Sequence, residues 1–460
     1  MMDNKPVPPS LKDQGYFLGR YLVASLLFFG NVFNYMLRVN INFAITAMVV
    51  SNPNATNGST PIVDDTCGFE DIEEDQDAYD GIFEWDEWTQ GMITGSFFWG
   101  YIITQIPGGR LAEKVGGRLV YGGCMTFTAL LTFLIPVAAH AGSGTLIAIR
   151  FMLGLSEGAT FPALSTLVAS WCPPIERSFF NTFTHIGAQF GIVLTYPLCA
   201  LLIQNLGWEF AFYIPAAMTL VWSVAWFVFV TNSPKDHRWV SETERDYILA
   251  SLGNTENTKT QAVPIRSILT SVPVLALVIT TFGDGWGFYT LLTELPQYMK
   301  IMLKKDMNSN ALSSALPYLG FMAMGVCLSI VGDILRQRGV VSTTTFRKLA
   351  TGLGQLGPAV CLFILTWVKC DKAATSGLLI AAVAMQVGKY KGHLVKIRGI
   401  CPRLWSKTSE ILNFYDGDLE GDLAGHSLGP RLNMPLIFTL YNREVGRTSL
   451  IYSLYNNIYL

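Results

Sequence analysis

The chain is poor in charged residues, since Asp, Glu, Lys and Arg make up only 14% of its 460 residues, whereas 50% are hydrophobic. Soluble domains typically carry about 25% charged residues. This deficit excludes an ordinary water-exposed surface over most of the chain and indicates a membrane protein. The net charge of −2, with no basic stripe, also argues against a nucleic-acid partner.

Cysteine and histidine occur without the spacings of a disulfide framework or a metal centre. The eight cysteines form no CxxC pair, and the five histidines stand at no metal-like spacing from them. The sequence also lacks a recognisable nucleophile–base set and a pair of catalytic carboxylates. We therefore expect a protein that is not an enzyme and that holds no metal or other resident cofactor.

Long apolar runs are what the sequence has instead. A membrane-spanning helix needs about 20 mostly apolar residues. Runs of this kind lie near 20–50, 89–109, 119–140, 144–171, 179–204, 209–231, 271–298, 311–333, 345–368 and 374–388. The expected fold is an all-α polytopic, multi-pass membrane protein with about ten spans.

These runs divide the chain into two transmembrane halves. We expect a cytoplasmic N-terminus at 1–19, a first half of six spans at 20–231, a linker at 232–265, a second half of four spans at 266–389 and a non-membrane tail at 390–460. Within the linker, Ser241 followed by Glu244 is typical of a capping box that opens a short surface helix.

The connections between the runs predict the orientation. The loop at 51–88 has twelve acidic residues, no Lys or Arg, and glycosylation sequons at Asn54 and Asn57, so it belongs outside the cell or in an organelle lumen. Most Lys and Arg residues follow spans two, four, six and eight, which assigns those connections and the N-terminus to the cytoplasm. The lysines after span seven depart from this pattern.

The stretch "GGRLAEKVGGR" (108–118) follows the second span, and "VGDILRQRGVVSTTTFRK" (331–348) echoes it after span eight. A repeat offset by six spans indicates two related halves. A phosphate-binding loop needs a preceding strand, which is absent here. We expect the glycines to form a tight turn and the charges to latch one conformation, through Gly108, Gly109, Arg110, Glu113, Lys114, Arg118, Asp333 and Arg336.

The same stretch resembles the loop signature of the major facilitator superfamily. "GSFFWGYIITQIPGG" (95–109), "RFMLGLSEGATFP" (150–162) and "WCPPIERS" (171–178) are similar to the animal anion–cation symporters, which include sialin, vesicular glutamate transporters and sodium–phosphate cotransporters. The resemblance implies two six-helix halves, of which the second is incomplete here. We interpret the abrupt change near Tyr390 as an alternative or misread reading frame.

Charged residues inside the apolar runs are the candidates for function, since each costs about 2.5–3.5 kcal/mol at the centre of a spanning helix. Arg38 offers a planar fork of donors for a carboxylate or phosphate, with a structural ion pair as the alternative. Arg150 and Glu157 are seven residues apart and so share one helix face about 10 Å apart. Gly154 and Gly158, which interleave with them at a small-xxx-small spacing, favour close packing to a neighbouring helix.

The resemblance implies that Glu157 is the ion-coupling acid and Arg150 a residue of the substrate pathway, although Arg150 could instead snorkel to the membrane surface. Asp284 lies between glycines that could interrupt its helix, and it is either a cation-coupling site or part of a structural pair. Tyr101 is a substrate-lining hydroxyl or an interfacial aromatic residue.

The sequence thus predicts a monomeric secondary transporter that carries a small organic or inorganic anion, coupled to protons or sodium, by alternating access. Its lipid bilayer would be the plasma membrane or a lysosomal or vesicular membrane. The alternative is a truncated, non-transporting membrane isoform with a regulatory or binding role.

Overall fold

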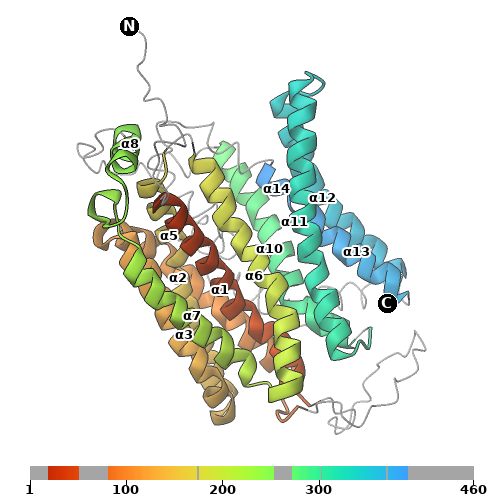
Figure 1. The fold of residues 1–460 in the computed structure, drawn as a ribbon. Coiled ribbons are helices and arrows are strands. Elements are labelled where there is room, and N and C mark those ends of the chain that lie inside the picture. The colour runs from red at the N-terminus through yellow and green to blue at the C-terminus, as the bar shows by residue number, and fades with distance from the viewer. Residues whose placement is uncertain are drawn as a thin grey trace.

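The computed structural model describes residues 19–50, 81–173, 176–252, 272–301, 303–368 and 371–391. The described part is built of helices, which confirms the all-α expectation (Figure 1). They are α1 (Gly19–Met48), α2 (Glu87–Val115), α3 (Gly117–Ala141), α4 (Ser143–Glu157), α5 (Thr160–Trp171), α6 (Arg177–Leu206), α7 (Phe210–Phe229), η1 (Pro234–Asp236), α8 (Glu242–Leu252), α10 (Val272–Ile301), α11 (Met307–Gln337), α12 (Thr343–Val368), α13 (Lys372–Met385) and α14 (Gly388–Lys391).

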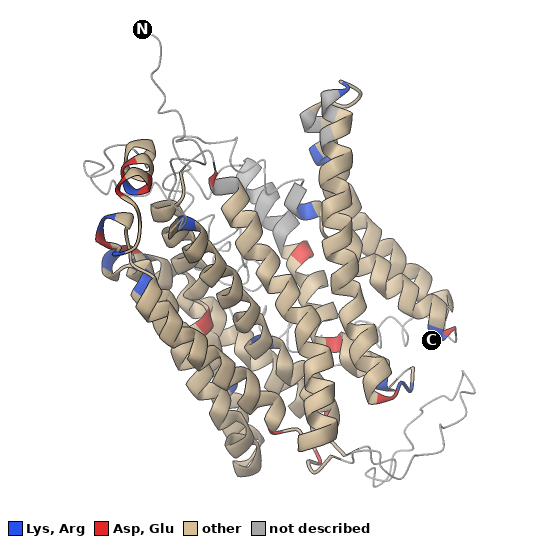
Figure 2. Cartoon of the chain, in the orientation of Figure 1, with Lys and Arg blue, Asp and Glu red and all other residues tan. Residues whose placement is uncertain are grey.

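Seven helical segments within the described residues are long and apolar enough to cross a membrane: α1, α3, the α4–α5 pair, α6, α7, α11 and α12. Helices α2 and α10 have a similar length, at 29 and 30 residues, but carry polar side chains such as Gln105 and Asp284 along their course. Charged residues gather near the two ends of the bundle, most densely around α8, and few lie in its middle (Figure 2).

Helices α2 and α4 pack at unusually close range because glycines face each other across their contact. A Cβ atom on Gly154 would overlap the carbonyl oxygen of Phe97, and one on Gly100 would overlap that of Phe151. A side chain on Gly158 would likewise meet the backbone of Tyr101. The prediction that Gly154 and Gly158 allow close packing is therefore confirmed, and α2 is the neighbour.

The fourth span is a helix pair with a break near its middle. Helix α4 ends at Glu157, and α5 begins at Thr160 after a turn through Gly158 and Ala159. The span runs from Ser143 to Trp171, so Glu157 is its fifteenth residue of 29. Within the membrane, a helix break is tolerated only where neighbouring protein groups surround it, which suits a functional position.

The stretch from Gly108 to Arg118 differs from the loop that the sequence predicted. Helix α2 continues to Val115, and the turn is confined to Gly116, whose φ of 105° favours glycine. Gly108 packs directly on Ala159, where a Cβ would clash. The apolar run ends at residue 109, before the helix does, because the exposed last turns of a helix need no apolar residues.

The linker helix α8 is tied to the start of α1. The Oγ of Ser241 accepts the backbone N–H of Glu244 at 3.2 Å, as expected for a helix cap. The Glu244 carboxylate, however, turns away from its own helix and accepts the N–H groups of Gly19 at 2.9 Å and Arg20 at 3.2 Å. Glu244 therefore caps α1 instead of completing the capping box. We call the end of the bundle that carries α8 the α8 face.

The two halves meet away from the α8 face. Helix α10 packs on α1, and α11 packs on α6. Several hydrogen bonds between the halves lie in the second half of α10: Asn42 of α1 donates to the carbonyl of Leu292 at 3.4 Å, and Gln297 donates to Gln90 of α2 at 3.2 Å. Tyr196 on α6 also donates to Leu292, at 3.2 Å. These contacts close the end opposite to the α8 face.

Three predicted features lie outside the described residues. They are the sequons at Asn54 and Asn57, most of the acidic loop, and the tail after Lys391. The side chains of Asp333 and Arg336 are also outside the described set, so the second copy of the latch motif stays a prediction.

Candidate functional site

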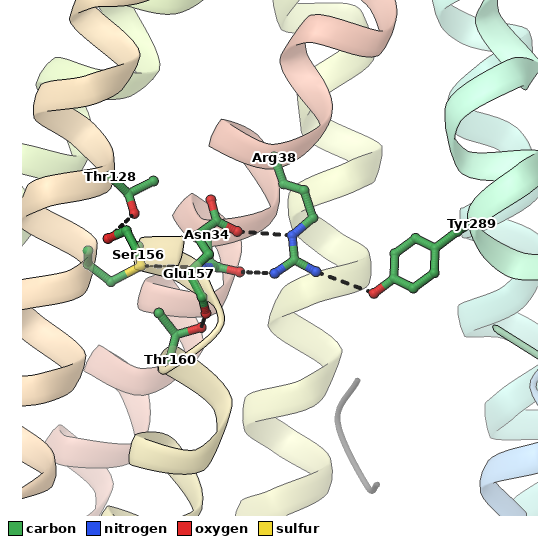
Figure 3. A network of polar contacts seen from close by, with 8 residues as sticks. Asn34, Arg38, Thr128, Ser156, Glu157, Thr160 and Tyr289 are labelled. Atoms are coloured by element: carbon green, nitrogen blue, oxygen red, sulfur yellow. Dashed lines mark hydrogen bonds and ion pairs between the residues drawn. The ribbon is translucent and has the colours of Figure 1, made fainter. Parts of the chain in front are cut away.

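Arg38 and Glu157 form a buried ion pair in the middle of the bundle (Figure 3). The Nε of Arg38 donates to Oε2 of Glu157 at 3.0 Å, and the two side chains are only 2% and 1% exposed. They are 119 residues apart in the sequence. The two candidates that the sequence treated separately, on α1 and α4, are therefore direct partners.

The guanidinium of Arg38 makes further contacts within the first half. Its Nη2 donates to Oδ1 of Asn34, one turn earlier on α1, at 3.4 Å. Three aromatic rings surround it, with centroids 4.7 Å away for Tyr35, 5.1 Å for Phe97 and 4.7 Å for Tyr101. Such cation–π contacts stabilise a desolvated cation and hold its plane in one orientation.

The Tyr101 ring thus packs against the Arg38 guanidinium, and the residue is only 1% exposed. This burial excludes the alternative of an interfacial aromatic residue. Tyr35 and Phe97 were not among the residues that the sequence analysis selected. Their signal was present, since both lie within one helical turn of a selected residue on the same helix.

Glu157 is positioned by the break after α4. The carbonyl oxygen of Glu157 accepts the Oγ1 of Thr160 at 2.6 Å, which holds the first turn of α5 against the end of α4. The preceding Ser156 donates to the carbonyl of Cys124 at 2.8 Å and accepts from Thr128 at 3.0 Å, and so anchors α4 to α3. The carboxylate Oε1 has no hydrogen-bond partner among the described residues.

Arg150 lies on the same helix face as Glu157, as the spacing predicted. It is 2% exposed, with its guanidinium carbon 5.0 Å from the centre of the Phe97 ring. Its Nε and Nη1 have no hydrogen-bond partner among the described residues. Because Arg150 is buried, the alternative of a residue that snorkels to the surface is wrong.

Tyr289 connects this cluster to the second half. Its hydroxyl accepts a hydrogen bond from Nη1 of Arg38 at 3.4 Å (Figure 3). Its ring packs edge-on against Phe98 of α2, with the ring centroids 4.8 Å apart. Tyr289 was not among the candidates selected from the sequence. A contact across 251 residues leaves no trace in local sequence patterns.

Asp284 lies on α10 between the central cluster and the α8 face. Its side chain is 6% exposed. The expectation that the neighbouring glycines interrupt the helix is wrong, because α10 runs without a break from Val272 to Ile301. Inside a membrane bundle no water is available to the backbone N–H and C=O groups, so they bond within the helix and keep such glycines helical.

The proposed latch residues of the first motif contact their own half. Arg110 pairs with Glu113 at 3.3 Å, and both are substantially exposed. The backbone N–H of Arg118 donates to Oδ1 of Asn232 at 2.9 Å, and the indole of Trp226 donates to the Arg118 carbonyl at 3.0 Å. These bonds join the start of α3 to the end of α7.

The charges of the central cluster favour an anion. Arg38 and Arg150 are both buried, and the Glu157 carboxylate beside them pairs with Arg38, so these three side chains carry a formal charge of +1 in a site with little access to water. An uncompensated buried charge is costly, and a bound anion would neutralise it. Among the described residues, no group of three or more His, Cys, Asp or Glu could hold a metal ion.

Comparisons with known proteins agree with this arrangement. The Major Facilitator Superfamily profile matches residues 27–388. A Drosophila melanogaster protein named as an inorganic phosphate cotransporter is 37% identical, over 92% of this chain and 80% of its own length. Human sialin is 39% identical over 76% of this chain and 71% of its own, and vesicular glutamate transporter 3 of Danio rerio is 34% identical over 89% and 69%.

The match to the Drosophila protein covers more residues than the 389 that precede the tail, and so it extends into the tail. The interpretation of the tail as an alternative or misread reading frame stays a prediction.

Two solved structures have the same fold. A bacterial homologue of the human lysosomal transporter Spinster, in an inward-facing conformation, has a TM-score of 0.58 at 15% identity, covering 93% of this chain and 83% of its own. The xylose transporter XylE of E. coli, in a partially occluded inward-open conformation, has a TM-score of 0.57 at 15% identity, covering 92% and 91%.

Proposed function

Because the chain belongs to the major facilitator superfamily, as a membrane transporter related to inorganic phosphate cotransporters, sialin and vesicular glutamate transporters, we propose that it moves a small carboxylate or phosphate anion by secondary active transport. The driving ion would be a proton or sodium, and transport would proceed by alternating access. One observation carries this proposal: the buried Arg38–Glu157 pair with Arg150 beside it, at the contact between the two halves.

Coupling follows from competition for Arg38. Its guanidinium can be balanced by the Glu157 carboxylate or by a transported anion. Protonation of Glu157 removes the negative charge that holds Nε at 3.0 Å, so Arg38 becomes available to the anion when a proton has bound. Release of the proton restores the pair and displaces the anion. Proton and anion would then travel together, as symport requires. Sodium coupling at Asp284 is the other arrangement.

Arg150 and Tyr101 would complete the substrate site. The Nε and Nη1 groups of Arg150 supply donors for a second oxygen of the anion. The Tyr101 ring makes a cation–π contact with Arg38 and would bring its hydroxyl to the same site. Arginine binds carboxylate and phosphate through two parallel hydrogen bonds, which suits a site that must select such anions.

Alternating access is supported by the uneven contacts between the halves. Apart from the central bond between Arg38 and Tyr289, the hydrogen bonds described above between the halves lie toward the end opposite to the α8 face, so the site would be reached from the α8 face. The distribution of Lys and Arg assigns the α8 face to the cytoplasm. This state would be inward-facing, like the two solved neighbours. Arg110 and Arg118 would latch the opposite state, and their loss should slow turnover without changing the preferred anion.

The proposal is tested by an uptake panel in reconstituted vesicles. Labelled phosphate, glutamate and other small carboxylates are supplied while pH and sodium gradients are imposed separately. We expect accumulation of at least one anion under one gradient. Correctly inserted protein that binds an anion but accumulates none would support the alternative, a non-transporting isoform. Protein that neither binds nor moves any of the anions would overturn the anion assignment.

A further inference from the structure

The second half carries buried polar groups that the central site does not use. Lys389 on α14 is 4% exposed, and Gln386 at the end of α13 is 3% exposed. Asp284 on α10 is 6% exposed. The charges of Lys389 and Asp284 are expensive inside a membrane bundle unless a partner or a polar path surrounds them. The sequence analysis selected only Asp284, because Lys389 stands one residue beyond the last apolar run.

These groups converge on one stretch of α10. The Nζ of Lys389 lies 4.9 Å from the centre of the Phe288 ring. Asp284 is four residues before Phe288 and so lies on the same helix face, one turn nearer the start of α10. A Cβ atom on Gly287 would stand 3.6 Å from Nε2 of Gln386, so the amide also points at α10. Its Oε1 has no hydrogen-bond partner among the described residues.

The backbone that presents Lys389 is held firmly. A Cβ on Gly354 of α12 would lie 2.9 Å from the backbone nitrogen of Lys389, and a Cβ on Gly388 would overlap the carbonyl oxygen of Ala350. Helix α14 is therefore pressed against α12, and the long side chain of Lys389 reaches from this contact to α10. In Figure 1, α14 appears beside α10 in the interior of the second half.

The two halves are built alike at this point. Helix α4 has 15 residues and α13 has 14, and each is followed by a two-residue turn and a further helix. Counted from the start of its span, Gln386 stands at the same place as Glu157. Helices α1 and α10 both have 30 residues, and each carries one charged candidate residue. Asp284 stands about two turns nearer the start of α10 than Arg38 does to the start of α1.

We propose that Lys389 and Gln386 are the second half's binding residues for the transported anion, with Asp284 as the counter-charge of Lys389. The polarity is exchanged between the halves: α1 supplies the cation and α4 the carboxylate in the first, whereas α10 supplies the carboxylate and α14 the cation in the second. The set lies nearer the α8 face than Arg38, on the side from which the site is reached. This inference rests on the proposed anion transport and extends the substrate site to both halves.

Binding to the purified full chain tests this without requiring transport. Inorganic phosphate and glutamate are titrated separately against the thermal unfolding of wild type, Lys389→Gln, Lys389→Arg and Asp284→Asn. For the anion that binds wild type, we expect Lys389→Gln to raise the apparent Kd at least tenfold and Lys389→Arg to stay within about threefold. Asp284→Asn should lower the Kd, because the competing carboxylate is gone.

Two controls separate the possible failures. Lys372→Gln, at the far end of α13, should bind as wild type does. Arg38→Gln should lose binding if the central site is correct. If Arg38→Gln loses binding while folded Lys389→Gln keeps the wild-type Kd, this inference is wrong and the proposed function stands. Equal losses of thermal stability in Lys389→Gln and Asp284→Asn, with an unchanged Kd, would mean a purely structural pair. If wild type binds neither probe, the anion assignment itself fails.

Discussion

At the scale of single residues, the central site depends on the shape of a guanidinium group as well as on its charge. Arg38 directs Nε to Glu157, Nη1 to Tyr289 and Nη2 to Asn34 at the same time. An ammonium group has three rotatable donors at a single point and cannot reproduce this planar arrangement. The three donors therefore link Glu157, the second half and the preceding turn of α1 through one side chain.

The substitution Arg38→Lys separates shape from charge. We expect the apparent Kd for the anion that binds wild type to rise at least tenfold, equal to about 1.4 kcal/mol, because the paired hydrogen bonds to the anion are lost. Titration of the anion against thermal unfolding measures this. Arg20→Lys, at the α8 face, is the matched control and should leave the Kd unchanged. Wild-type affinity in Arg38→Lys would show that positive charge alone is sufficient.

At the scale of helices, the site depends on the close approach of α2 and α4. Gly100 and Gly154 let the two backbones meet, which brings Phe97 of α2 against Arg150 of α4. Tyr101, one turn later on α2, lies against Arg38 of α1. In a membrane, where lipid is as apolar as the helices, such close packing is a main source of helix association.

The substitution Gly154→Ala tests this dependence. The added methyl group would overlap the Phe97 carbonyl oxygen, so the helices must separate. Overpacking typically costs about 1–3 kcal/mol, and we expect a lower thermal unfolding midpoint and weaker anion binding. Gly123→Ala on α3 is the control, since its Cβ would meet nothing within 4 Å. Equal behaviour of the two variants would contradict the proposed role of the α2–α4 contact.

The helices were largely predictable from sequence, whereas their partners were not. Apolar runs and the clustering of Lys and Arg are local signals, and each run overlaps one helix, or a broken pair of helices, of the described structure over most of its length. The glycine spacing on α4 also predicted its close packing. The pairing of Arg38 with Glu157, and the approach of Tyr289 and Lys389 to the centre, join distant segments. Only the packed bundle determines these contacts.

At the scale of the whole molecule, the two halves are joined at the central site by Arg38 and Tyr289 and, beyond it, toward the end opposite to the α8 face. Gln297 of α10 donates to Gln90 of α2 at 3.2 Å, and Asn42 and Tyr196 both donate to the carbonyl of Leu292. Alternating access requires these contacts to break in each cycle so that the end of the bundle that they close can open. The neutral hydrogen bonds suit this role, because each contributes only about 0.5–1.5 kcal/mol.

A cross-link between the halves tests this movement. We expect a disulfide formed between Gln90→Cys and Gln297→Cys to abolish uptake and to leave anion binding from the α8 face intact, and reductant should restore uptake. Each single cysteine variant is the control, and labelled uptake before and after oxidation is the measurement. Full uptake by the cross-linked protein would mean that this end does not open during transport.

The most direct test of the central claim, that Glu157 couples the driving ion to the anion bound at Arg38, compares two activities of Glu157→Gln in the same vesicles. One is accumulation of labelled anion under an imposed gradient, and the other is exchange of labelled for unlabelled anion without a gradient. The account predicts that exchange persists, because Arg38 still binds the anion, while gradient-driven accumulation is lost. Accumulation at the wild-type level by Glu157→Gln would contradict it.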